Sequence, residues 1–166
     1  MDSATRKRGA AKARDKFKSM RGQSLVEFAL VAPLFFLLVF AVVDFGRLFF
    51  MQMTLQNALQ EAARYAVTGQ HQPDPKNPGN NLSRIASIQQ VAQQAAPGMD
   101  VSNLSISSKS GGPNSGGGPK DTVTLSLTTS VPLITPVIGI FFPGGAYTFT
   151  VSVSLMNEPF PPSSTT

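Results

Sequence analysis

The residues of this sequence whose types and spacing most clearly indicate a chemical role are Gly22 and Glu27, at the start of its longest apolar stretch. Glu27 follows Gly22 by five positions, and residues 28–43 beyond it carry no charged side chain. A carboxylate within a membrane segment costs about 2.5–3.5 kcal/mol on insertion scales, so an acid in such a place usually has a function. The spacing therefore indicates that Glu27 does specific work inside a membrane.

The apolar stretch that contains Glu27 predicts a transmembrane helix over residues 23–43. A bilayer core needs about 20 helical residues, which this segment supplies. Pro33 removes one backbone donor and is expected to kink or loosen the helix. A cleaved signal peptide does not fit, because the apolar region is too long and no small-x-small site follows it.

The charge distribution predicts the orientation of that helix. Residues 1–22 contain eight Lys or Arg against two Asp, whereas the remaining 144 residues carry six basic and seven acidic side chains. Because basic flanks are retained in the cytoplasm, residues 1–22 are expected to form a basic cytoplasmic leader, with the bulk of the chain exported. Nucleic-acid binding is the rival interpretation of the basic cluster. It is disfavoured because no aromatic or helical readout element accompanies the charges, so we expect no nucleic-acid partner.

Residues 44–69 are expected to continue the helix outside the membrane. Asp44 and Arg47 stand three positions apart and could pair where the helix leaves the bilayer. Gly69 and the prolines after it predict that the helix ends near residue 67. Apolar residues at spacings of seven predict a packing seam along this part of the helix. The seam comprises Phe45, Leu48, Leu55, Leu59, Ala62 and Ala66.

Residues 70–157 read as a small exported α+β domain. Residues 81–96 predict a short helix capped by Asn81. Alternating apolar and hydroxyl residues predict three antiparallel strands, near 104–106, 122–128 and 147–155. The predicted fold is thus α+β: a long N-terminal helix packed on a small antiparallel sheet of about three strands, with one short extra helix.

Three connecting or terminal segments complete the layout. The Gly-rich segment 110–119 is expected to form a flexible hairpin loop. Residues 131–142 are apolar but too short for a second span, and two interpretations stay open: a buried crossover between strands, or an exposed docking surface. The Pro- and Ser/Thr-rich tail, 158–166, is expected to be disordered.

Catalytic chemistry finds little support in the sequence. The chain has no Cys, and its one histidine, His71, lies in a Pro-rich loop that is a poor scaffold for a metal site or a catalytic triad. The Gly-rich segment lacks the Lys-Ser/Thr and the helix of a P-loop. We therefore expect no enzyme activity, no cofactor, no metal and no small-molecule substrate. A membrane-tethered hydrolase or binding protein is the disfavoured alternative.

Three motifs together carry a family resemblance. They are Arg-Gly-Gln-Ser-Leu-Val-Glu-Phe-Ala-Leu-Val-Ala-Pro-Leu over 21–34, Asp-Phe-Gly-Arg over 44–47, and Asn-Ala-Leu-Gln-Glu-Ala-Ala-Arg-Tyr-Ala-Val over 57–67. With them the sequence resembles the TadE-like family, minor pseudopilins of the Tad (Flp-type) branch of type IV pilus systems. The specific resemblance covers about residues 20–68, and the strand-rich remainder agrees in layout.

The resemblance implies a function for Gly22 and Glu27. An aspartic prepilin peptidase would cut between Gly22 and Gln23 on the cytoplasmic face of the bacterial inner membrane. Glu27 would become the fifth residue of the mature chain and would pair with the free N-terminal amine of a neighbouring subunit. The implied partners are that peptidase, other Tad pilins and pseudopilins, and the Tad inner-membrane platform. An uncleaved single-pass assembly factor, recruiting pilus machinery through its exported domain, is the alternative.

Overall fold

The computed structural model describes residues 3–161, and the side chains of residues 22–161 except Pro136. The chain divides into two compact units, Met1–Asp44 and Phe45–Thr166, here called the N-terminal unit and the C-terminal unit. Helix α1, Ser3–Val67, contributes to both. Its end at Val67 agrees with the predicted stop, and Gly69 follows with a φ of 68° that favours glycine.

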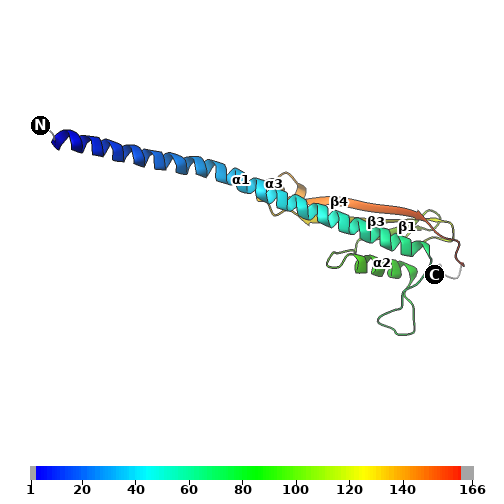
Figure 1. Cartoon of the computed structure of the whole chain (residues 1–166). Coiled ribbons are helices and arrows are strands. Elements are labelled where there is room, and N and C mark those ends of the chain that lie inside the picture. The colour runs from blue at the N-terminus through cyan, green and yellow to red at the C-terminus, as the bar shows by residue number, and fades with distance from the viewer. Residues whose placement is uncertain (1–2, 162–166) are drawn as a thin grey trace. The chain divides into compact units, whose positions relative to one another are not determined.

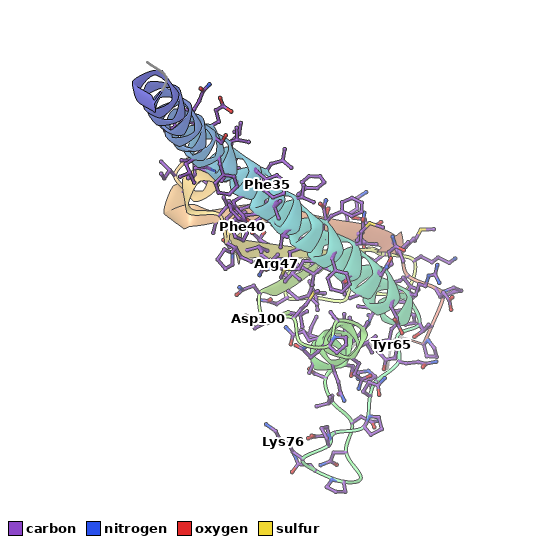
Figure 2. The ribbon with its side chains drawn as sticks, turned by 60° about the vertical axis from the view of Figure 1, so that its left-hand side comes forward. Phe35, Phe40, Arg47, Tyr65, Lys76 and Asp100 are labelled. Atoms are coloured by element: carbon purple, nitrogen blue, oxygen red, sulfur yellow. The ribbon has the colours of Figure 1, made fainter. Side chains whose placement is uncertain are left out.

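In the N-terminal unit, α1 begins at Ser3, so residues 3–22 of the expected leader are helical and continuous with the apolar segment. Ala, Lys and Arg favour helix, and the leader contains no proline that would break it. Beyond the leader, large apolar side chains are exposed along α1; Leu30, for example, is 73% exposed. Phe35 and Phe40 project from the helix surface (Figure 2). By length and hydropathy, α1 from Gly22 onward is the one helix of the described residues that could cross a membrane.

The C-terminal unit combines the last part of α1 and helix α2, Arg84–Ala95, with one antiparallel sheet (Figure 1). The predicted α+β class is confirmed, but the sheet has four strands in the order β2-β1-β3-β4. The strands are β1 Leu104–Ser108, β2 Gly112–Pro113, β3 Thr122–Pro132 and β4 Ala146–Met156. The additional strand, β2, consists of two residues in the Gly-rich segment, which was too short and too irregular in pattern to predict.

The alternating pattern of the strands separates a packed face from an exposed face. On β3, Val123 and Leu125 are buried, and the intervening hydroxyls lie on the other face. There, Thr128 and Thr150 approach to 2.8 Å between their hydroxyl oxygens across the β3–β4 pair. The packed face joins α1 and α2 in one apolar core. Its fully buried larger side chains include Leu55, Leu59, Ile88, Ile106, Val123, Leu125 and Leu127.

Helix α2 begins two residues later than a cap at Asn81 predicts. Its N-cap is Ser83 rather than Asn81, because the Ser83 hydroxyl accepts the Ala86 N–H at 3.3 Å. Asn81 instead forms an isolated bridge with Pro73. A serine hydroxyl in that position satisfies one of the donors left free in the first turn.

Two segments differ from simple expectations. Residues 131–142 do not form a buried crossover. Val131 and Pro132 are the last two residues of β3, and residues 133–142 belong to the connection between β3 and β4, which contains the short helix α3, Pro136–Gly139, and the 3₁₀ turn Pro143–Gly145. Within the expected tail, the Glu158 N–H donates to the Val67 carbonyl oxygen at 3.0 Å, and Phe160 is only 9% exposed. The rest of that tail, residues 162–166, lies outside the described residues.

Candidate functional site: the processing motif, the seam and the arginine clasp

Gly22, the residue at the expected processing position, is not required by packing. A Cβ added at Gly22 would meet no atom within 4 Å, and its backbone is helical. Glycine in a helix interior is less favourable than alanine by about 1 kcal/mol, so the fold alone would select against it. The glycine therefore needs an explanation other than local structure.

Glu27 lies one turn beyond Gln23 on an exposed part of α1. The Gln23 side-chain amide donates to Glu27 Oε1 at 3.1 Å, as residues four apart on a helix can. An amide satisfies one lone pair of the carboxylate but supplies no positive charge. In a lipid environment the negative charge of an ionised Glu27 would therefore stay uncompensated by this contact.

Asp44 and Arg47 flank the boundary between the two units. Asp44 is buried, at 3% exposure, whereas the Arg47 side chain is exposed. The expected ion pair between them stays a prediction.

The predicted seam divides into a buried part and an exposed part. Leu55, Leu59, Ala62 and Ala66 are at most 1% exposed and belong to the core. Leu48 is half-buried, and Phe45 is 71% exposed.

The physical reason for this division is the drift of a heptad repeat on a straight helix. On an ideal straight α-helix, residues seven apart are rotated by about 20° relative to one another. Phe45 stands three heptads before Ala66 and is therefore turned about 60° away from the buried face. Phe45 instead stacks on Phe49, with ring centroids 6.5 Å apart. The spacing of seven also missed Ala58 and Ala63, which are fully buried.

Arg84 is a buried charged residue that the sequence analysis did not single out. It is 3% exposed, and its guanidinium donates to the carbonyl oxygens of Ala66, at 2.8 Å, and Gly117. The guanidinium carbon lies 4.7 Å from the centroid of the Phe160 ring, in cation–π range. Burial lowers the pKa of Arg84. We call this arrangement the arginine clasp: it ties the end of α1, the Gly-rich segment and the C-terminal segment to α2.

Glycines provide the signal that could have indicated the clasp. A Cβ at Gly116 would lie 2.9 Å from Arg84 Nε, and one at Gly69 would lie 2.8 Å from the Phe160 ring. These glycines therefore permit close approach. The Gly-rich segment is also held by Asn157, whose side-chain amide donates to the carbonyl oxygens of Gly116 and Gly118 at 2.8 Å each.

The surface beside α1 in the C-terminal unit carries shallow hollows. One, of about 360 Å³, is lined by Gln56, Gln60, Arg64, Ser152, Val153 and Leu155. Within the described residues, no three His, Cys, Asp or Glu side chains converge to hold a metal ion. His71 has a structural contact: its Nδ1 lies 2.8 Å from the Leu82 carbonyl oxygen.

The comparison with protein families matches residues 22–64 to the TadE-like protein family. The match confirms the resemblance over the segment that holds Gly22, Glu27 and most of the seam. Neither the curated proteins nor the solved structures gave a match to the chain. The family match and the apolar α1 together fit a membrane protein associated with the Tad pilus system.

Proposed function

We propose that this protein is a minor pseudopilin that takes part in assembling a Tad-type pilus at the bacterial inner membrane. Residues 23–43 span the membrane, the leader 1–22 is cytoplasmic, and the C-terminal unit is exported. A prepilin peptidase removes the leader between Gly22 and Gln23. One observation supports the proposal above all: Gly22, which packing does not require, is followed five residues later by the acid Glu27, where the apolar part of α1 begins.

Cleavage would supply the charge that Glu27 lacks. The new amine of Gln23 is an ammonium at neutral pH, and a neighbouring subunit presents Glu27 to it among the apolar residues of the membrane-spanning helices. A buried carboxylate and a buried ammonium are each costly alone, and pairing them relieves part of both costs. A subunit inserted out of register leaves both charges unmatched, so the pair selects the correct register.

The leader must unwind before a peptidase can cut it, since α1 runs unbroken from Ser3 through the cleavage position. Glycine has a low helix propensity, so the helix should unwind most easily at Gly22, directly beside the bond to be cleaved. Gly22 thus gives the peptidase access to the backbone and has no role in the packing of the fold.

The continuous helix also favours a second candidate function. If the leader stays attached, α1 is a permanent anchor, and the C-terminal unit recruits pilus machinery as a static assembly factor. The other Tad pilins and pseudopilins and the inner-membrane platform are partners in either case.

Two measurements on the native host test the proposal. Mass spectrometry of the membrane-extracted protein should find an N-terminus at Gln23; an intact leader in piliated cells would contradict it. Glu27→Gln should permit cleavage but abolish pilus assembly. The matched control is Glu61→Gln, an exposed acid on the exported part of α1, which should assemble normally. Normal pili from both variants would support the static anchor instead.

A further inference from the structure

The β3–β4 connection leaves a set of apolar side chains uncovered at one end of the C-terminal unit. Ile134 and Val137 are about half exposed, and Ile140 and Phe141 are each 81% exposed. Connecting loops are normally polar, because they run through water. Here no charged residue occurs anywhere from 122 to 157. This composition suits an apolar environment.

The position of this loop follows from the direction of β4 relative to α1. The Glu158 N–H donates to the Val67 carbonyl oxygen, so the C-terminal end of β4 lies at the C-terminal end of α1. Gln56 and Arg64 of α1 share a hollow with Ser152 and Leu155 of β4, so the two elements run side by side (Figure 1).

The lengths of the two elements then fix the level of the loop. β4 extends from Met156 back to Ala146, about 34 Å at about 3.4 Å per residue. The same distance along α1 corresponds to about 23 residues, which leads from Val67 back to the first residues of the C-terminal unit, near Phe45. Phe45 follows directly on the apolar segment of α1. The loop thus lies at the end of the unit that is covalently joined to the membrane span.

We propose that the loop Leu133–Phe142 is a second membrane-contacting element, which rests its apolar side chains in the interfacial layer of the bilayer. The inference rests on the proposed membrane insertion of residues 23–43. Lipid is the occupant of the exposed apolar side chains of the loop. The backbone joins this end of the C-terminal unit directly to residues 23–43, and it therefore also keeps this end at the bilayer surface.

The backbone and the aromatic residues of the loop suit an interface rather than the hydrocarbon core. Within the loop, the N–H of Gly139 donates to the Thr135 carbonyl at 2.9 Å, and that of Phe142 donates to Gly139 at 3.1 Å. Such internal bonds lower the cost of removing the backbone from water. Tyr147 packs edge-on against Phe142 with centroids 5.9 Å apart, and tyrosine is enriched at membrane interfaces.

The experiment uses the full chain in phospholipid vesicles with single cysteines, which the cysteine-free sequence allows. Phe141→Cys carries an environment-sensitive fluorophore, and lipid-bound nitroxide and aqueous iodide serve as quenchers. Lys109→Cys, an exposed position at the far end of the sheet, is the aqueous control, and Leu38→Cys is the control inside the span. The Phe141 label should be quenched by lipid nitroxide several-fold more than the Lys109 label, and by iodide several-fold less.

The outcomes separate the two proposals. If the Leu38 label is also insensitive to lipid nitroxide, the proposed insertion of residues 23–43 fails. If Leu38 is quenched but Phe141 is quenched only by iodide, the loop contacts water and the inference is overturned. If the Phe141 label is shielded from both quenchers, protein covers the patch, for example a second copy, and the inference is overturned as well. A label at Val137→Cys should lose its lipid quenching when Phe141→Asp is added, with the Leu38 label unchanged.

Discussion

Truncating Leu59 tests the claim that α1 is an integral part of the core of the C-terminal unit. Leu59 is fully buried, and its side chain belongs to the cluster that joins α1, α2 and the sheet. Replacing a buried leucine by alanine loses the transfer free energy of the removed carbons and leaves a cavity, about 3–5 kcal/mol together. Small domains have a total stability of about 5–15 kcal/mol, so Leu59→Ala should remove a large share of it.

Phe45→Ala is the matched comparison, because the heptad pattern assigned Phe45 and Leu59 to the same seam. Phe45 is 71% exposed, so the substitution should change the free energy of unfolding by less than about 0.5 kcal/mol. The spacing of seven alone would predict comparable costs for the two changes. The structure predicts that they differ several-fold.

Urea titration of the full chain in detergent, read out by pulse proteolysis of the C-terminal unit, measures both variants. With a urea dependence of about 2 kcal/mol per molar, Leu59→Ala should lower the midpoint by about 2 M. Phe45→Ala should leave it within about 0.3 M. Equal shifts for the two variants, or no shift for Leu59→Ala, would refute the packing of α1 on the sheet.

Two further predictions concern polar groups of the same unit. Arg84→Met should lower the free energy of unfolding by about 1–3 kcal/mol, because the carbonyl oxygens of Ala66 and Gly117 both lose the guanidinium donor and Ala66 keeps only the weaker contact with the Gly69 N–H at 3.3 Å. The same urea titration measures the change, with exposed Arg64→Met as the control expected to change little. Burial raises the pKa of Tyr65 above its ordinary value of 10.0, so the stability gained from the neutral phenol is complete below pH 10.0 and declines as the pH rises through the raised pKa. Urea midpoints measured between pH 9 and 11 should therefore fall less in Tyr65→Phe than in the parent chain; identical pH curves for the two would contradict the prediction.

The sequence predicted those features that depend on local pattern. The helix stop near residue 67 follows from Gly69, and three of the four strands, β1, β3 and β4, follow from the alternation of apolar and hydroxyl residues. The match over residues 22–64 agrees with the family that the Gly22 and Glu27 motif indicated. Each of these signals is carried by residues close together in the chain.

The features that were not predicted depend on residues far apart in the chain. Arg84 is buried because carbonyls near residues 66 and 117 and the ring of Phe160 converge on it, and no local spacing encodes that meeting. Phe45 was assigned to the seam because a strict spacing of seven ignores helical drift. The exposure of Phe141 depends on where the β3–β4 connection falls relative to the core, which the apolar composition of the segment alone left undecided.

The burial of the seam limits where the proposed assembly contacts can form. Leu55, Leu59, Ala62 and Ala66 are occupied within their own unit, so they are unavailable to pack on a neighbouring subunit. Lateral packing through α1 must then use surfaces that are exposed in the single chain, above all the apolar side chains between residues 25 and 43. Apolar packing of that kind is permissive in lipid, because sliding by a turn exchanges one aliphatic contact for another. A buried charge, by contrast, is costly in every register in which it lacks a partner. Glu27 is the one charged side chain among residues 22–43. The internal use of the seam therefore strengthens the case that register between subunits is decided at Glu27.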